Sequence, residues 1–459
     1  MPVARAAKTT NSAKPLSFHG SEKGCPPTFC ASSDSPLRLR ATGGRHNKMT
    51  REILISLTFT ALCGCYDDTT DRPAPANTLN NIGFTLAASK RVLVVVDSDY
   101  ASSAVAFVDL TSGEVASKIL TSGTKVSATT TALSGDLVVA QSPALDLTAV
   151  LVDRNHSVIT WIGRGGGISQ LSVSTGFAAN PQDYAQVSAR YGWASRNARN
   201  PLPSAPTDDF DEGDDLVEID LATHKIVRRV PLGAHTSLPG AAAGAMRMAF
   251  DGVSLWVPLS SISADFKAQG AGRVLAVDAK AAAIVATVDL PTTKNCTTVR
   301  YLAKTQRLAV ACSGSFAEPT KQTQQSAIAV FSAATPSDAE IVFQANELPG
   351  GTPFSKDFVC LDERHCAVIG FGDFAIGRPD KLWHLDLVTR KATFVANCAA
   401  PFAGSGLFAD AATGIVWLGE RKRSNGDLRR FDFTNGNKEL PAISSNPGGL
   451  GATEFGAMQ

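Results

Sequence analysis

The feature that most constrains the fold is a repeated motif in which a strand-like run ends in an aspartate, passes through a turn and continues as a second strand. Five clear copies are VAFVDLTSGEVASKIL, LVEIDLATHKIVRRVPLG, VLAVDAKAAAIVATVDL, LWHLDLVTRKATFVAN and LRRFDFTNGNKELPAI. Two more divergent copies are AVLVDRNHSVITWIG and IAVFSAATPSDAEIVFQ. The marker residue, which is Asp in six copies and Ser332 in one, falls at positions 109, 153, 220, 278, 332, 386 and 432. The chain therefore contains seven copies of one unit.

Each copy follows a more continuously apolar run, such as RVLVVVDSD or GVSLWVPLSS. Short apolar and β-branched runs bounded by Gly, Pro, Asp and Ser indicate strands. A unit of about 50 residues with several strands cannot cover its own apolar faces, so it must stack on its neighbours. The radial arrangement of such units is a β-propeller. We expect an all-β protein with a single seven-bladed propeller over residues 82–459.

The marker aspartate suits a turn because its short side chain can accept hydrogen bonds from the backbone just ahead. In VDLTSGE, the glycine that follows can supply the positive φ that such a turn often needs. The motif is therefore locally consistent as strand, turn and strand.

These repeats resemble the YVTN-type propeller repeats of bacterial secreted and surface proteins. The clearest match is NPQDYAQVSARYGWASRN followed by DDLVEIDLATHKIVRRVPLG, and the resemblance covers roughly residues 82–440. The letters Tyr-Val-Thr-Asn never occur together in this chain. The resemblance implies a propeller fold and a surface location, and it implies no catalytic residue.

The segment MTREILISLTFTALCGCYDD, residues 49–68, has the order of a secretory signal peptide. Basic residues precede an apolar run that ends in small residues, and this run is too short to span a bilayer. Its end, Leu62 to Cys65, resembles a bacterial lipobox, which implies cleavage before Cys65 and a lipid on the Cys65 thiol. A chance apolar patch is the alternative. Residue 66, directly after Cys65, is Tyr rather than Asp. By resemblance to sorted bacterial lipoproteins, this residue implies the outer membrane as the destination.

The regions on either side of this signal have no apolar periodicity. Residues 1–48 have the composition of a disordered stretch, and we interpret Met49 as the true initiator. Residues 65–81 contain prolines that favour an extended chain, and we expect a tether there. The formal net charge is +1, and the chain after the basic leader is slightly acidic, so we expect no nucleic-acid partner.

Two cysteine pairs flank predicted hairpins. Cys296 and Cys312 are symmetric about one turn, and Cys360 and Cys366 are symmetric about another, so each pair lies opposite across its hairpin. Export to an oxidising compartment favours a disulfide in each pair; two buried thiols are the alternative. Cys398 has no evident partner in the sequence.

Other candidate sites are weaker. The acidic stretch DDFDEGDD offers Asp209, Asp211, Asp214 and Asp215 as a weak calcium candidate, although a solvated acidic insertion is favoured. The glycine-rich GRGGG, residues 163–167, is interpreted as an inter-strand loop. No two histidines lie at a ligand-like spacing. The five tryptophans fall in predicted strands and are expected to pack between blades. The sequence indicates no cofactor.

Two functional classes stay open. The first is a lipid-anchored binding or interaction scaffold at the cell envelope, monomeric, held on the membrane by its lipid, with a protein or small-molecule ligand at a propeller face. The second is a propeller enzyme, such as a lactonase, a lyase or a quinoprotein dehydrogenase, with its site at the central channel. Such sites draw single residues from several blades, so local motifs do not reveal them.

Overall fold

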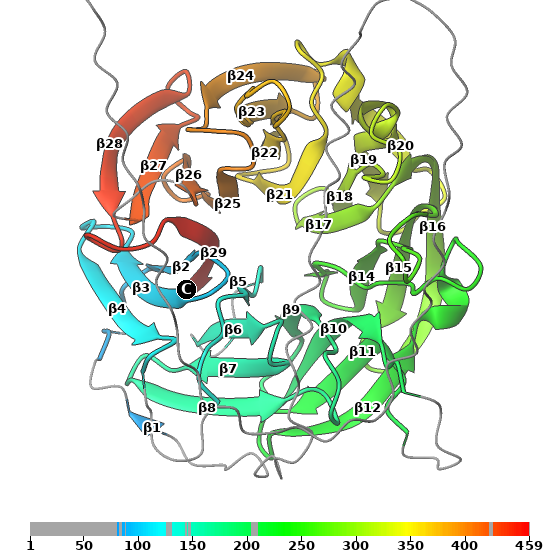
Figure 1. Ribbon diagram of the computed structural model, residues 1–459, viewed down its shortest axis with the longest axis horizontal. Helices are drawn as coiled ribbons and strands as arrows, with labels where there is room; N and C mark the ends of the chain where they lie inside the picture. Colours follow the sequence, from blue (N-terminus) through cyan, green and yellow to red (C-terminus); the bar gives the residue numbers. More distant parts are fainter. Residues whose placement is uncertain are drawn as a thin grey trace, which may run out of the picture. The chain divides into compact units, whose positions relative to one another are not determined.

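The computed structural model describes residues 80–81, 85–87, 89–124, 131–142, 145, 148–202, 210–421 and 426–458. These residues form seven antiparallel sheets arranged as blades around a central channel (Figure 1). The seven-bladed propeller expected from the repeat is confirmed. The leader with Met49, and the expected tether from Cys65 to residue 79, lie outside the described residues. The last two residues of the expected tether, Asn80–Asn81, form a short strand that pairs with the strand Gly167–Ser172.

Five of the seven blades follow one plan, in which consecutive strands run from the channel outward, and four of them are described first. One contains β9 (Pro181–Gln186), β10 (Tyr191–Arg199), β11 (Gly213–Asp220) and β12 (Lys225–Pro231). The next contains β13 (Ala249–Phe250), β14 (Ser254–Leu259), β15 (Ala271–Asp278) and β16 (Ala283–Lys294). The third contains β17 (Cys296–Leu302), β18 (Arg307–Ser313), β19 (Ser326–Ser332) and β20 (Glu340–Gln344). The fourth contains β21 (Phe354–Cys360), β22 (His365–Gly370), β23 (Lys381–Asp386) and β24 (Lys391–Asn397).

The other three blades include the two that meet where the ring closes. One follows the same plan with β25 (Gly404–Asp410), β26 (Ile415–Glu420), β27 (Asp427–Asp432) and β28 (Lys438–Ser444). Another combines β29 (Ala452–Met458) with β2 (Val92–Ser98), β3 (Ser103–Asp109) and β4 (Val115–Thr121). The last contains β5 (Leu137–Val139), β6 (Ala149–Asp153), β7 (Val158–Ile162), β8 (Gly167–Ser172) and the short β1 (Asn80–Asn81). Three short helices lie between strands: η1 (Gly233–His235), α1 (Gln322–Gln325) and η2 (Ala345–Glu347).

The marker aspartates hold the turns between third and fourth strands. Asp109 Oδ1 accepts the backbone N–H groups of Thr111 and Ser112 at 2.8 and 3.2 Å. Asp220, Asp278, Asp386 and Asp432 each accept two backbone N–H groups in the same way. The turn chemistry inferred from the motif is therefore confirmed at five markers.

The copy around Asp153 departs from this plan. Its strand, β6, is the second strand of its blade, because the short β5 lies innermost. Asp153 consequently lies at the opposite end of its blade from the other markers, and it accepts the amide and hydroxyl of Ser134 at 2.8 and 2.7 Å. The motif therefore covers the second and third strands of this blade, whereas it covers the third and fourth strands of the others. The motif is local, and a local motif cannot report how many strands precede it.

The C-terminal strand closes the ring. β29 pairs antiparallel with β2, from Val92 opposite Met458 to Asp97 opposite Ala452. The innermost strand of this blade thus comes from the end of the chain and the other three strands come from the start. Opening the ring would therefore expose the edge of β2.

Because each blade starts at the channel, the innermost strands all run in the same direction along it. The parallel bridge between Arg247 and Thr298, in neighbouring blades, agrees with this. We call the end where innermost strands begin the loop face; it also holds the connections between second and third strands and between blades. The opposite end, with the short turns, is the turn face.

The core consists of seven apolar clusters, each shared by two neighbouring blades. All five tryptophans are buried within these clusters, which confirms that they pack between blades: Trp161, Trp193, Trp256, Trp383 and Trp417. Every blade therefore depends on both neighbours for burial of its apolar faces.

A second, polar link joins blades at one position of the repeat, six residues before the marker. Asp214 accepts the backbone N–H groups of Ala243 and Gly244, where the next blade begins, at 2.9 and 2.8 Å. Asp380 likewise accepts the backbone N–H groups of Phe402 and Gly404, at the start of the blade that follows it, at 2.9 and 2.8 Å. In two other blades a serine at this position forms the hydrogen bond to the next blade. Ser326 Oγ accepts the amide of Phe354 at 2.8 Å, and Ser103 Oγ donates to the carbonyl of Ser134 at 2.7 Å. The repeat thus encodes an inter-blade clamp as well as a turn.

Candidate functional site

Charged side chains from three blades meet across the central channel. Glu454 on β29 forms ion pairs with Arg247, from the chain just before β13, and with Lys356 on β21. Arg247 and Glu454 are both buried. Burial opposes ionisation of Glu454, but the charges of Arg247 and Lys356 hold the pKa of this carboxyl below its usual range. The channel therefore contains a compensated, ionised network.

Two further carboxylates line the same part of the channel. Asp183 on β9 accepts the amides of Met248 at 2.8 Å and Gln141 at 3.2 Å, which link it to both neighbouring blades. Asp357 on β21 lies 3.9 Å from the Nη1 atom of Arg247. Its Oδ1 atom is buried and has no hydrogen-bond partner among the described residues. Burial raises the pKa of both carboxyls.

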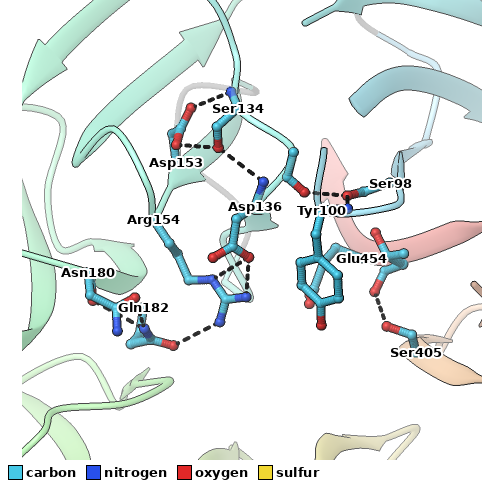
Figure 2. Close-up of polar contacts among 12 residues, drawn as sticks. Ser98, Tyr100, Ser134, Asp136, Asp153, Arg154, Asn180, Gln182, Ser405 and Glu454 are labelled. Carbon is cyan, nitrogen blue, oxygen red and sulfur yellow. Dashed lines mark hydrogen bonds and ion pairs between the residues drawn. The ribbon is translucent and has the colours of Figure 1, made fainter. Parts of the chain in front are cut away.

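The rim of the channel on the loop face carries a polar network (Figure 2). Arg154 forms an ion pair with Asp136, with Nε 3.0 Å from Oδ1. Its Nη1 atom donates to the Oε1 atom of Gln182 at 3.4 Å. Gln182 in turn donates to the side chain of Asn180 at 2.7 Å. These side chains come from two adjacent blades, so they fix this stretch of the rim as one rigid surface.

Tyr100 stands on the same rim (Figure 2) with its side chain 57% exposed. It adopts φ 71°, a conformation that side chains rarely take. Gly135 pairs with it, and a Cβ on Gly135 would lie 2.2 Å from the backbone carbon of Tyr100. The guanidinium of Arg421 lies 4.2 Å from the centre of the tyrosine ring. Close backbone packing thus presents an aromatic ring at the channel mouth.

Beside the mouth, the loop face carries an exposed apolar patch. The patch is formed by Phe316, Phe371, Phe374, Ile376 and Phe402, from the second-to-third-strand loops of two blades and the connection to a third blade. The four aromatic rings form a chain of neighbours. Phe316 lies next to Phe371, Phe371 next to Phe402, and Phe402 next to Phe374, at centroid distances of 5.9, 5.3 and 6.4 Å. Ile376, at the tip of its loop, is 70% exposed. Contiguous apolar surface of this kind marks interaction sites.

Three basic side chains of the loops around this patch are paired with acidic ones. Lys321 lies 3.6 Å from Glu318, and Arg378 lies 3.7 Å from Asp373. The loop of the preceding blade holds Lys267 3.6 Å from Asp265. Arg421, whose amide donates to the carbonyl of Ala403 beside Phe402, instead lies against the ring of Tyr100. Because each of these three ion pairs is neutral, the pairs add no net positive charge to the apolar surface.

The turn face holds a cavity of about 300 Å³ at the other end of the channel. It lies between the ends of the innermost strands β17, β21, β25 and β29. Arg300 and Gln141 supply polar groups to its wall, and leucines and Phe455 supply apolar ones. This end of the channel is thus chemically distinct from the rim of the loop face.

Both predicted disulfides are present. Cys296 is bonded to Cys312, and Cys360 to Cys366. In each pair the two residues are directly opposite in the hairpin register, as the symmetry about each turn indicated. Cys398 is buried and lies outside both bonds.

The acidic stretch is not a solvated insertion where the structure describes it. Asp211 and Asp215 both pair with the fully buried Arg196, at 2.6 Å each, and Asp214 belongs to an inter-blade clamp. All three carboxylates are buried because these partners compensate their charge. Asp209 lies outside the described residues. No group of three or more His, Cys, Asp or Glu side chains suited to a metal ion occurs in the described part of the chain.

Two histidines that are distant in sequence come together. The Nδ1 atom of His365 lies 2.9 Å from Nε2 of His384, and Nδ1 of His384 lies 2.8 Å from Oδ1 of Asn437. The histidines sit on adjacent strands, a pairing that spacing alone did not indicate. Residues 163–167 form the turn between β7 and β8, as expected for an inter-strand loop.

The channel residues escaped the sequence analysis. Arg247, Lys356 and Glu454 lie in MRMAFDG, FSKDFVC and TEFGAM, where a charge interrupts a strand-like run. That interruption is the signal that could have found them, because a charged side chain in an innermost strand must face the channel or a partner.

The sequence matches no protein-family model and no curated protein. Solved structures share the fold. The periplasmic gluconolactonase of Pseudomonas aeruginosa is similar with a TM-score of 0.52 and 13% identity, over 81% of this chain and 99% of that one. The Kuenenia stuttgartiensis hydrazine synthase is similar with a TM-score of 0.50 and 11% identity, over 73% of this chain and 92% of that one. At such identities the likeness shows the propeller fold alone. Among the described residues, no helix has the length and apolar character to cross a membrane.

Proposed function

We propose that this protein is an exported, lipid-anchored propeller that acts as an interaction scaffold, and that it docks a protein partner on its loop face. The observation that carries the proposal is the exposed aromatic patch of Phe316, Phe371, Phe374, Ile376 and Phe402. Aromatic residues are enriched in protein interfaces, where they form the buried centre of the contact. The patch and the polar network of Figure 2 lie on the same face but belong to different blades.

Charge favours a protein over a lipid surface as the occupant. Membrane-binding faces combine apolar tips with unpaired lysines and arginines that meet anionic headgroups. Here Lys267, Lys321 and Arg378 are paired with Asp265, Glu318 and Asp373, and Arg421 lies against the ring of Tyr100. A protein surface needs no such excess of positive charge.

A photo-crosslinking residue at Ile376 tests the docking in the native envelope. We expect one specific protein adduct from position 376, lost when Phe402 is also changed to Ser. The matched control is the same residue at Val388, which is 68% exposed but lies in a turn on the opposite face. Adducts from 388 as strong as those from 376, adducts with lipid only, or none at either position would contradict the proposal.

The anchor is supported by the lipobox-like Leu62 to Cys65. Cys65→Ser should move the protein from the membrane pellet to the soluble fraction, while Cys63→Ser should leave it anchored. Only Cys65 has leucine three positions before it and glycine just before it. Several acyl chains, each contributing about 0.8 kcal/mol per buried methylene, would account for firm attachment. A pellet unaffected by Cys65→Ser would end the lipoprotein interpretation.

An enzyme with its site in the channel is the second candidate, and one observation favours it. Asp357 is a buried carboxyl with a raised pKa, which is the condition for a general acid at neutral pH. Gluconolactone is the natural first probe, given the periplasmic gluconolactonase that shares the fold. Hydrolysis by the wild type that is lost in Asp357→Asn would favour an enzyme. Hydrolysis no faster than the uncatalysed rate would remove this candidate.

A further inference from the structure

Arg300 is half-buried, lines the cavity on the turn face and differs from the buried arginines. Its Nε atom donates to the carbonyl oxygen of Phe358 at 2.8 Å. Within the described residues, its two terminal nitrogens have no hydrogen-bond partner and no carboxylate lies within ion-pair distance. By contrast, Arg196, Arg247 and Arg429 each face carboxylates directly. Arg164 and Arg430 also lack a carboxylate partner, but backbone carbonyls accept from their terminal nitrogens; the terminal nitrogens of Arg300 have neither kind of partner among the described residues.

The nearby acids are engaged elsewhere. Asp183 accepts two backbone amides, and Asp357 is oriented to Arg247. At the cavity rim, Asp362 accepts the amides of Arg364 and His365, and Glu363 accepts that of Lys304. Arg247, the neighbouring cation, is paired with Glu454.

A guanidinium in this position cannot relieve its burial by losing a proton. Burial, together with the charge of Arg247, lowers the pKa of Arg300 to about 10, which leaves it charged at neutral pH. The guanidinium is half-buried, and its terminal nitrogens are not among the buried atoms without a partner, so a ligand in the cavity could reach them. Because Nε is already used, the two terminal nitrogens present a planar fork, and that geometry suits the two oxygens of a carboxylate or phosphate.

The remaining walls define the rest of the ligand. Leu302, Leu361, Leu407 and Phe455 line the cavity beside Arg300. Its volume of about 300 Å³ is at the lower end of the range for small-molecule sites. Asp362 and Glu363 lie at the rim, so the fork of Arg300 beside the leucines and Phe455 favours a small organic molecule that directs one oxyanion at Arg300 and its carbon skeleton at the apolar wall.

We propose that the turn-face cavity is a binding site for a small organic oxyanion, held by the terminal nitrogens of Arg300 with its apolar part against the leucines and Phe455. This site is independent of the partner-docking surface on the loop face.

Calorimetric titration of the full chain with phenyl phosphate and with phenylacetate tests the site and separates the two kinds of oxyanion. We expect at least one of the two to bind, and its affinity to fall at least tenfold, about 1.4 kcal/mol, in Arg300→Met. Arg300→Lys, which keeps the charge but not the fork, should bind with intermediate affinity. The control Arg390→Met removes an exposed arginine on another surface and should bind as the wild type does.

A second variant guards against a folding defect in Arg300→Met. Leu361→Trp fills the cavity from its apolar side and leaves Arg300 in place, so it should also abolish binding. Thermal melting of each variant checks that it is folded. The proposal is overturned if neither anion binds the wild type at about 10 mM, or if binding persists in Arg300→Met or in Leu361→Trp.

Discussion

Arg196 illustrates how single residues decide whether a charge can be buried in this propeller. Its side chain has no exposed area, yet Asp211, Asp215 and the carbonyl of Val173 take up its donors. The carboxylates are buried with it, so neither sign of charge is left alone. Removing one partner of such a buried ion pair destabilises a protein more than replacing the whole pair with well-packed apolar side chains.

We expect Arg196→Met to lower the free energy of unfolding by about 3–5 kcal/mol, because Asp215 would keep a buried charge without a paired cation and Asp211 would keep only Arg229, at 3.7 Å. Urea denaturation at neutral pH measures this. Arg190→Met is the control: Arg190 also pairs with an aspartate, Asp220, but its side chain is largely exposed, so its loss should matter much less. Equal losses in the two variants would contradict the role assigned to burial.

Asp97, on the closing blade, carries a different signature of burial. Its Oδ1 atom accepts the hydroxyl of Ser445 at 2.8 Å, while Oδ2 is buried with no partner among the described residues. Burial raises the pKa of Asp97 to about 7, against about 3.9 in an unfolded chain. The folded protein therefore binds this proton more tightly than the unfolded chain does.

The unfolding free energy should accordingly fall as pH rises from about 4 to about 7 and change little from this group above that. Asp97→Asn keeps an acceptor for Ser445 and cannot ionise. We expect the variant to match the wild type near pH 4 and to exceed it in stability at pH 8, by a few kcal/mol at most. Other buried acids, such as Asp380, titrate in both proteins and cancel in the comparison. A stability difference that is the same at both pH values would refute this account.

At the scale of elements, the hairpin is the unit that carries covalent and polar reinforcement. Both disulfides join the first and second strands of one blade, and the marker aspartates hold the turns between third and fourth strands. The clamps at Asp214 and Asp380 then tie one blade to the start of the next. Some contacts thus stabilise single hairpins, and others join neighbouring blades.

The two disulfides should differ in their effect on stability because they close loops of different length. Their sequence separations are 16 and 6 residues. In the chain-entropy view, replacing Cys296 and Cys312 by Ala should cost about 3 kcal/mol, and replacing Cys360 and Cys366 about 2 kcal/mol. Chemical denaturation of the two double variants, with the wild type in reductant as control, measures the order. A larger loss for the shorter loop would show that strain or packing, rather than loop closure, dominates.

At the scale of the whole molecule, the ring depends on one strand at the end of the chain. β29 covers Val92, Val94 and Val96 of β2, and all three side chains are fully buried. Every apolar cluster is shared by two blades, so a gap at the closure would weaken both neighbouring interfaces.

We expect removal of residues 452–459 to yield an unfolded or aggregating protein, although the other six blades keep all their strands. A chain ending at Met458 retains β29 and should behave as the wild type does. Size-exclusion chromatography and thermal melting distinguish the two. A soluble, cooperatively melting truncate, whether cut at residue 452 or before Gly414, would show that closure is dispensable.

The sequence by itself determined the features that depend on neighbours along the chain. The turns at Asp109 and Asp386 and the two cysteine pairs each involve residues within one hairpin, so alternation and symmetry about a turn were enough to predict them. The number of repeats fixed the number of blades, since each copy supplies one sheet.

Only the tertiary structure decided what meets across the ring. Arg247 and Glu454 are 207 residues apart in sequence, and they pair because seven blades close at a particular radius. That radius depends on the packing of every inter-blade core, so no single repeat can predict it. The same holds for the innermost place of β5, the closure by β29 and the unpaired fork of Arg300. Strand and turn signals act over a few residues, whereas a channel is the sum of all the contacts around it.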